Sequence, residues 1–477
     1  MHPSKTHTLL TFVVAFTLNS VVLERVPADD EQRPPNFIIL LCDNLGYGDI
    51  GCFGSTKHRT PNIDQMAKDG VRLTSFYSVS GVCTPSRAGL MTGCYPRRVG
   101  LALTEPDGIV LRPVSPNGLH PNELTFAEVL KRRGYVTTCI GKWHLGDQPK
   151  FLPTQQGFDS YFGIPYSDDM TPRPNRNWPP LPLMQNERVI EAPVDRSLLT
   201  KRYTERAVKF IEDNRDRPFF LYLPHAMPGS TKSPFASERF LGKSANGTYG
   251  DSVEEIDWST GEILDALKRF KIDDRTLVVW TSDNGAPRRN PEQGSNLPLR
   301  GWGYSTMEGG MRVPCIVRWP NKIPSGQECD ELSTMMDLLP TFAKLAGGES
   351  EVGTIDGHDI WSLLSQNNGA KSPYSAFYYY HRDQLHAVRS GRWKLHLASS
   401  VAQHRLVDKP NNKSVFLVDL EADVGESTNV AVENPTVVTD LLKLAEQART
   451  DLGDGDLPGK NEREVGRVSD PKPQELP

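Results

Sequence analysis

Two pairs of adjacent polar residues, Asp43-Asn44 and Asp283-Asn284, could hold a hard metal ion. Each pair closely follows a run of apolar residues. Carboxylate and amide oxygens suit Ca²⁺ or Mg²⁺ better than zinc. A single pair also suits an ordinary turn, because Asp and Asn side chains hydrogen-bond to nearby backbone groups. Two pairs in the same setting favour a metal site.

Lys142 and His144 flank a tryptophan. In an extended segment, residues two apart face the same side, so both side chains would point at one object such as an anion. An exposed polar strand end is an equally good interpretation. His225 follows another apolar run and could serve as a base.

Cys83-Thr-Pro-Ser-Arg87 is the most informative segment, since a helix could begin near Ser86. Helix N-termini stabilise anions and lower the pKa of a thiol. A thiolate nucleophile would need a nearby histidine, and His144 or His225 could provide it. The alternative is a buried cysteine that caps the helix.

Helical patterns alternate with apolar runs along most of the chain, which predicts an α/β fold with a large, mostly parallel or mixed sheet between helices. Such sheets bind ligands at the carboxyl ends of their strands. We therefore expect the polar residues after the strands to converge on one edge. The predicted strands are 36–42, 71–77, 135–140, 219–223 and 276–280, and the stretch 154–193 is predicted to be a long loop.

The length of 477 residues predicts about two or three domains. Residues 1–28 resemble an export signal, with a single membrane anchor as the alternative. Residues 35–365 would form the catalytic domain. Residues 366–453 would form a smaller α+β subdomain with three short strands, one of them 387–397, and a helix over 435–452. The charged, proline-rich segment 454–477 is predicted to be disordered.

The net charge of −5 implies no basic face for nucleic acid. Seven cysteines with no zinc spacing do not predict a disulfide framework. Cys139 and Cys315 lie in apolar runs and are expected to be buried free thiols.

Cys83-Thr-Pro-Ser-Arg87, with Thr92-Gly93, resembles the signature of the formylglycine-dependent sulfatases, a branch of the alkaline phosphatase superfamily. The resemblance covers roughly residues 35–453 and implies the alkaline phosphatase-like fold. Further blocks occur in the family's order: Asp43-Asn-Leu-Gly-Tyr-Gly-Asp49, Gly141-Lys-Trp-His-Leu-Gly146, Ser282-Asp-Asn-Gly285 and Glu308-Gly-Gly-Met-Arg-Val-Pro314.

The resemblance implies that a separate maturing enzyme oxidises Cys83 to formylglycine, whose gem-diol attacks sulfur. It also implies that Arg87 and His144 hold the gem-diol and that Lys142 contacts the sulfate. One Ca²⁺, rather than Mg²⁺, would be held by Asp43, Asn44, Asp283 and Asn284. The family usually has aspartate where this chain has Asn44, so one negative charge is lost and affinity is expected to fall.

Two further departures affect the leaving-group side. The family usually has a second histidine at the position of Gly229 and a lysine at that of Gly303. His225, Lys232 and Arg300 are the candidates to replace them, with Lys142, His225 and Arg300 as the substrate-binding set.

The resemblance predicts an exported sulfatase, located in the periplasm, outside the cell or in the lysosome. Its substrate would be a sulfated small molecule or polysaccharide. A phosphodiesterase or phosphonate hydrolase of the same superfamily is one alternative. A non-catalytic protein that binds sulfated glycans is the other.

Overall fold

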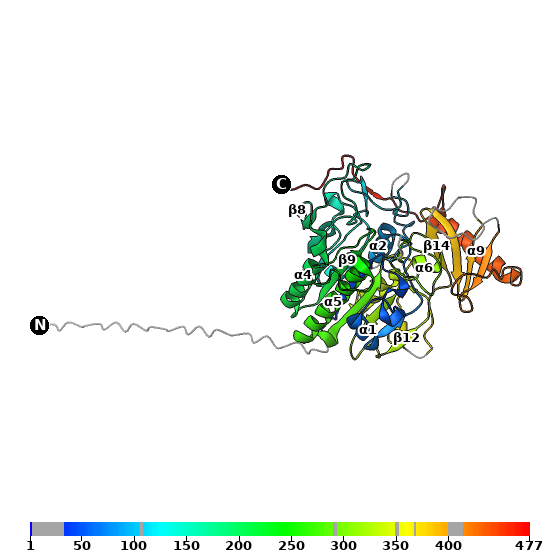
Figure 1. The fold of residues 1–477 in the computed structure, drawn as a ribbon, viewed down its shortest axis with the longest axis horizontal. Helices are drawn as coiled ribbons and strands as arrows, with labels where there is room; N and C mark the ends of the chain where they lie inside the picture. Colours follow the sequence, from blue (N-terminus) through cyan, green and yellow to red (C-terminus); the bar gives the residue numbers. More distant parts are fainter. Residues whose placement is uncertain (2–32, 105–107, 290–292, 349–352, 367–368, 399–413) are drawn as a thin grey trace. The chain divides into compact units, whose positions relative to one another are not determined.

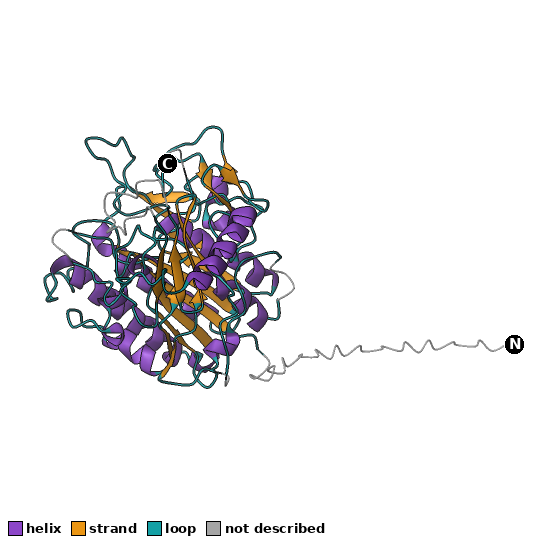
Figure 2. Ribbon diagram, turned by 90° about the vertical axis from the view of Figure 1, so that its right-hand side faces the viewer, coloured by secondary structure: helices purple, strands orange, loops and turns teal. Residues whose placement is uncertain are grey.

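A ten-stranded mixed sheet forms the centre of the computed structural model (Figure 2). The structure describes residues 1, 33–104, 108–289, 293–348, 353–366, 369–398 and 414–477. From edge to edge the strands are β12 (Gln327–Cys329), β2 (Val71–Leu73), β11 (Cys315–Arg318), β10 (Thr276–Ser282), β1 (Asn36–Asp43), β9 (Phe219–Pro228), β5 (Val136–Ile140), β6 (Ser160–Gly163), β7 (Leu183–Gln185) and β8 (Arg188–Glu191).

The five central strands β10, β1, β9, β5 and β6 are parallel to one another, whereas β11 and β7, which flank them, are antiparallel. Every residue of β1 is buried, as expected for a strand covered on both faces. Alternate side chains of β1 enter different cores: Phe37, Ile39 and Leu41 face one, and Ile38 and Leu40 face the other. The α/β class and the mixed sheet expected from the sequence are therefore confirmed.

Helices cover both faces of this sheet (Figure 2). The hydrophobic pattern of each helix selects its face, because its apolar side chains join one of the two cores. One face is covered by α1 (Pro61–Lys68), α4 (Leu199–Asn214) and α5 (Gly247–Arg269), and the other by α2 (Cys83–Thr92), α3 (Phe126–Arg132) and α7 (Leu338–Leu345).

Two predicted elements differ from the structure. The stretch 154–193, predicted to be a loop, contributes the strands β6, β7 and β8, which lie in this order at one side of the large sheet and end in the edge strand β8. The predicted strand 71–77 is two short strands, β2 in the large sheet and β3 (Phe76–Tyr77), which pairs with β13 (Ser333–Thr334). Strands of two to four residues carry too little periodicity to be recognised in the sequence.

The C-terminal region forms a four-stranded antiparallel sheet with a helix beside it, as expected (Figure 1). The predicted strand 387–397 is in fact a hairpin of two strands. The elements are α6 (Glu308–Met311) and α8 (Trp361–Leu364), which precede the sheet, then β14 (Phe377–His381), β15 (Gln384–Ser390), β16 (Trp393–His396), β17 (Phe416–Asp419) and α9 (Pro435–Leu452).

The segment 454–477 was predicted to be disordered, but in the structure it is bound to the catalytic part of the chain. Its strand β20 (Gly466–Arg467) pairs with β4 (Asn117–Gly118). Arg463 forms an ion pair with Glu123 at 2.9 Å. Composition indicated only that this segment has no core of its own; backbone hydrogen bonds and ion pairs with a preformed surface order it instead.

All seven cysteines are free, and Cys139 and Cys315 are fully buried as expected. Within the described ranges, no helix is long and apolar enough to cross a membrane. The predicted export signal, residues 1–28, lies outside the described residues apart from Met1.

Candidate active site

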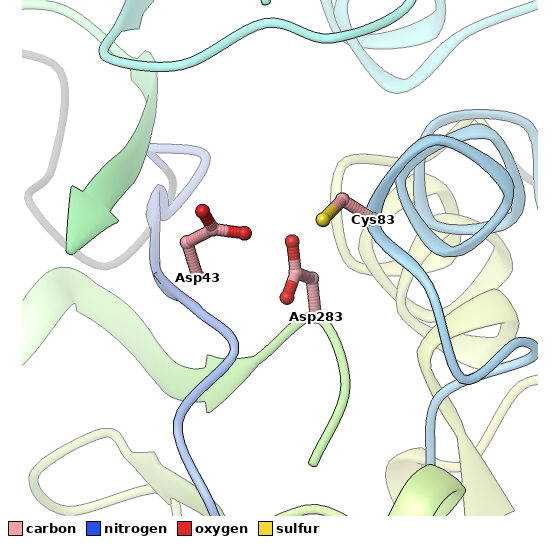
Figure 3. Close-up of side chains that lie close together, drawn as sticks. All are labelled: Asp43, Cys83 and Asp283. Atoms are coloured by element: carbon pink, nitrogen blue, oxygen red, sulfur yellow. The ribbon is translucent and has the colours of Figure 1, made fainter. Parts of the chain in front are cut away.

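The aspartate of each Asp-Asn pair lies at the carboxyl end of a parallel strand, beside Cys83. Asp43 is the last residue of β1, and Asp283 follows the neighbouring β10. Figure 3 shows Asp43, Cys83 and Asp283 pointing toward one another. One ligand atom from each of these three residues lies within 4.8 Å of the others. The convergence expected from strand ends is present for these residues.

Cys83 reaches this point because it is the first residue of α2. Val82 is extended and precedes the helix, and Pro85 falls in the first turn, where a missing N–H costs nothing. Gly93 ends the helix in a left-handed conformation with φ 66°. The helix thus begins three residues earlier than predicted and presents the side chain of Cys83 at its N-terminus.

Two buried cations neutralise the two carboxylates. Arg87 donates to Asp283 Oδ2 from Nε at 3.0 Å and from Nη2 at 2.8 Å. Lys142 Nζ donates to Asp43 Oδ2 at 2.8 Å. All four side chains are fully buried. The site is therefore a dry, charged cluster that could not persist without close pairing.

The two carboxyl groups respond differently to this setting. Burial raises the pKa of Asp43, but the charges of Lys142 and Arg87 outweigh burial and hold it at about 2. Burial, and then the charge of Asp43, raise the pKa of Asp283. A divalent cation between them would stabilise both ionised forms.

The amide side chains of the two pairs bring further hard oxygens to the cluster. Asn44 Oδ1 accepts a hydrogen bond from Asn284 Nδ2 at 2.6 Å. Asn44 itself has φ 58°, a left-handed conformation that asparagine tolerates well. Asp43 Oδ1 and Asn284 Oδ1 are buried and have no hydrogen-bond partner in the part of the chain that the structure describes. Orphaned oxygens beside paired carboxylates fit a Ca²⁺ ion, which takes six to eight oxygen ligands.

The thiol of Cys83 is not activated as a thiolate. Burial raises its pKa well above the ordinary value, and the charge of Asp43 raises it further. These effects outweigh the lowering by Lys142 and Arg87. The geometry thus does not favour a cysteine that attacks directly.

His144 lies beside this cluster, although its backbone is not extended as assumed, since φ is 64°. Its Nε2 lies 2.9 Å from the carbonyl oxygen of Leu111, and its buried Nδ1 has no hydrogen-bond partner within the described segments. Burial, then the charges of Lys142 and Arg87, lower the pKa of His144. Because a carbonyl only accepts, Nε2 carries the proton and Nδ1 is a neutral acceptor.

Three candidates from the sequence lie elsewhere. The ring of His225 faces α5, with Nε2 3.4 Å from Ser259 Oγ. Arg300 Nη1 donates to the carbonyl oxygen of Glu426 at 2.6 Å, and Lys232 is exposed. β9 continues to Pro228, so His225 lies within a strand and not after its end. No hydrogen bond or ion pair among the described residues joins these three to Cys83 or the acidic pairs.

Sequence reasoning missed four residues that contact the cluster or lie beside it. Lys142 Nζ donates to Ser167 Oγ at 3.3 Å, and Asp168 follows in the chain. Asn44 Nδ2 donates to Ser230 Oγ at 2.8 Å, which lies 3.0 Å from the hydroxyl of Tyr304. Ser230 and Tyr304 each follow a glycine at which the chain departs from the family pattern, a signal that the sequence contained.

Two family models match the chain. The model described as Sulfatase matches residues 35–348. The model described as N-sulphoglucosamine sulphohydrolase, C-terminal, matches residues 304–450. Together they span the large sheet and the C-terminal sheet.

Characterised sulfatases resemble the chain over most of its length. It is 37% identical to human arylsulfatase A over 452 residues, covering 86% of this chain and 87% of the relative. It is 40% identical to the N-acetylgalactosamine-6-sulfatase of Canis lupus familiaris over 385 residues, covering 76% and 72%. The crystal structure of Ps i-CgsB in complex with k-i-k-neocarrahexaose superposes with a TM-score of 0.72 at 30% identity, covering 87% and 92%. The chain therefore belongs to the sulfatase family and is a sulfuric ester hydrolase.

Proposed function

We propose that this sulfatase cleaves sulfate esters of carbohydrates or aryl alcohols with a formylglycine made from Cys83, beside a Ca²⁺ ion held by the two Asp-Asn pairs. One observation carries the proposal: the side chain at position 83 shares a buried cluster with two strand-end carboxylates and two cations. A separate maturing enzyme would carry out this oxidation.

When present, the formylglycine hydrate supplies a hydroxyl nucleophile and the Ca²⁺ ion supplies Lewis-acid stabilisation of developing charge. The side chains of the chain then have separate tasks. Arg87 positions Asp283, because its hydrogen bonds go to Asp283 and to the carbonyl oxygen of Lys142. Lys142 has three N–H donors and two partners, so one donor remains for a sulfate oxygen.

His144 accepts a proton or hydrogen bond at Nδ1, because its Nε2–H is held by the carbonyl oxygen of Leu111. The lowered pKa keeps the ring neutral, which suits an acceptor close to residue 83. Exclusion of water from the cluster strengthens each of these interactions.

The role of Cys83 is tested by combining mass spectrometry of its peptide with turnover. Protein coexpressed with a maturing enzyme should contain the aldehyde at position 83 and release sulfate. Cys83→Ala should lower kcat by at least about 10³-fold, since removal of a nucleophile costs that much or more. Undiminished turnover in the variant would sink the proposal.

The role of Ca²⁺ is tested by chelation. Treatment with a chelator should abolish sulfate release, and Ca²⁺ should restore it better than Mg²⁺, since the ligand set is rich in carboxylate and amide oxygens. Full activity after verified metal removal would contradict the assignment.

The substrate class rests on the relatives. The names of N-acetylgalactosamine-6-sulfatase and of the Ps i-CgsB complex mention carbohydrates, and the name of arylsulfatase A mentions an aryl sulfate. A screen of sulfated sugars, with the phosphate ester of the same alcohol in parallel, decides the class. Faster release of phosphate than sulfate would favour a phosphoryl hydrolase of the same superfamily over a sulfatase.

Export is part of the proposal, because residues 1–28 have the composition of a signal. Deleting them should retain the protein in the cytosol of the expression host, as measured by fractionation. Unchanged secretion would contradict this role.

A further inference from the structure

Gly229 is packed so closely that it leaves no room for a side chain. Its φ is 68°, and a Cβ at this position would lie 2.7 Å from the carbonyl oxygen of Ala226 and 2.8 Å from Asp168 Oδ1. Both distances are shorter than real Cβ contacts allow. The carboxyl group of Asp168 therefore occupies the space that a side chain at residue 229 would enter.

Asp168 lies at the edge of the cluster already described. It is in the loop after β6, and the preceding residue, Ser167, accepts a hydrogen bond from Lys142 Nζ. On its other side, the backbone N–H of Gly229 donates to the carbonyl oxygen of Asp43 at 2.9 Å. Contacts thus run from Asp43 through Lys142 and the 167–168 loop to Gly229 and back to Asp43.

The carboxyl group of Asp168 is buried without a hydrogen bond to any described residue. Its side chain is fully buried, and neither carboxyl oxygen has a hydrogen-bond partner among the described residues. Arg196 Nη1 lies 4.0 Å from Oδ2, beyond hydrogen-bonding distance. Buried polar atoms without partners are rare in native proteins and call for an explanation.

The surroundings keep this acid protonated near neutral pH. Burial is the largest effect, and the charges of Asp169 and Asp43 add to it, so the pKa of Asp168 rises to about 8 despite Lys142 and Arg196. The titratable and charged groups that face it are Asp43, Lys142, Asp169, Arg196 and Tyr203.

The two histidines proposed from the sequence are poorly suited to donate a proton to the leaving group. His144 is neutral and its Nε2–H is held by a carbonyl oxygen. His225 faces α5, and burial lowers its pKa to about 4. Alcohols of sugars are poor leaving groups, so a sulfatase that acts on them needs an acid.

We propose that Asp168 is the general acid of this enzyme and donates its carboxyl proton to the oxygen of the departing alcohol. This inference rests on the proposed sulfatase function. As the sulfuryl group is transferred, the S–O bond of the ester breaks and its electron pair remains on the leaving oxygen. The O–H bond of Asp168 breaks at the same time, giving a neutral alcohol and a carboxylate, which water reprotonates before the next turnover.

The test compares two substrates in the variant Asp168→Asn, made in protein with verified formylglycine at position 83. Asparagine keeps the shape of the carboxyl group but cannot serve as the acid. A sugar sulfate should lose about 10²- to 10⁴-fold in kcat, the usual size of a general-acid contribution. A nitrophenyl sulfate should lose less than about tenfold, because its phenolate departs without a proton.

Asp216→Asn is the matched control. Asp216 lies two residues after the end of α4, and its side chain is 89% exposed. It should leave both substrates unchanged. Equal losses on both substrates in Asp168→Asn, or no loss on either, would overturn the inference while leaving the sulfatase function standing. No sulfate release from either substrate by the mature wild-type enzyme would instead overturn the proposed function.

The wild-type enzyme provides a second test that does not depend on folding of the variant. Asp168 acts in its protonated form, so kcat on the sugar sulfate should fall as pH rises through about 8, whereas kcat on the nitrophenyl sulfate should not. Titration of the metal ligands would affect both substrates alike. Superimposable profiles above that pH would overturn the inference.

Discussion

Replacing Lys394 with methionine tests how the C-terminal sheet is held to the catalytic part. Lys394 lies on β16, and its ammonium contacts Glu308 Oε1 at 3.0 Å, Glu426 Oε1 at 2.7 Å and the carbonyl oxygen of Thr306 at 2.9 Å. All three ionised side chains are fully buried. Methionine fills a similar volume but leaves two buried carboxylates without their shared cation.

The expected cost is about 3–5 kcal/mol, the usual penalty for breaking a buried ion pair from one side. Unfolding entropy of about 2.1 cal/mol/K per residue, over the compact unit Pro34–Pro477, gives about 0.9 kcal/mol/K. The melting temperature should therefore fall by about 3–5 °C.

The penalty should also depend on pH. Burial raises the pKa of Glu308, but Lys394, Arg312 and Arg389 outweigh burial and hold it at about 2. This is below the value of about 4.3 for an unfolded glutamate, so the stabilisation is present above that pH and is lost as pH falls towards 2. The difference between wild type and variant should therefore stay nearly constant from pH 7 to about 5 and shrink as the pH falls from about 4 towards 2.

Denaturant unfolding of the two proteins measures this difference directly. Adding Glu308→Gln and Glu426→Gln to the variant should recover part of the loss, because the stranded charges are removed. Lys371→Met is the matched control, since its ion pair with Glu331 involves a lysine side chain that is 79% exposed. A change below about 1 kcal/mol for Lys394→Met, similar to that expected for an exposed pair, would refute the reasoning.

Three further predictions concern the active site. Arg87→Lys should lower kcat by at least about tenfold, because one ammonium cannot replace the guanidinium hydrogen bonds to Asp283 and to the Lys142 carbonyl oxygen. Circular dichroism should show that the fold is retained. Unchanged turnover would contradict this prediction. Asn44→Asp should tighten Ca²⁺ binding in calorimetric titration by adding a ligand charge, and weaker binding would count against Asn44 as a ligand. Gly229→Ala should destabilise the fold by about 1–3 kcal/mol, because alanine meets both a positive φ and Asp168; a neutral effect in thermal unfolding would show that this loop relaxes.

Several features of the fold could be predicted because local pattern expressed them. The continuous apolar run of β1 indicated a strand buried on both faces, and α9 has the bounds expected from its amphipathic pattern. Edge strands β7 and β8 and the ordered segment after 454 could not be predicted in this way. They are held by neighbours distant in the chain, so their own composition carries little signal.

In the candidate active site, too, some positions could be predicted from local sequence pattern and others could not. The strand-end rule placed Asp43 and Asp283 at the carboxyl ends of neighbouring strands, as the structure has them, because the apolar runs of both strands could be recognised in the sequence. It failed for His225, because β9 runs five residues beyond the predicted strand and turns that side chain towards α5.

The sequence by itself determined the family, the central strands and several of their helices, and the residues that carry charge near Cys83, since motifs and periodicity are properties of neighbouring residues. Only the tertiary structure decided which polar groups share one dry cluster and which face a helix. It alone brought Asp168 against Gly229, two residues 61 positions apart. Such juxtapositions depend on strand length, register and loop path, which are set by packing across the whole sheet.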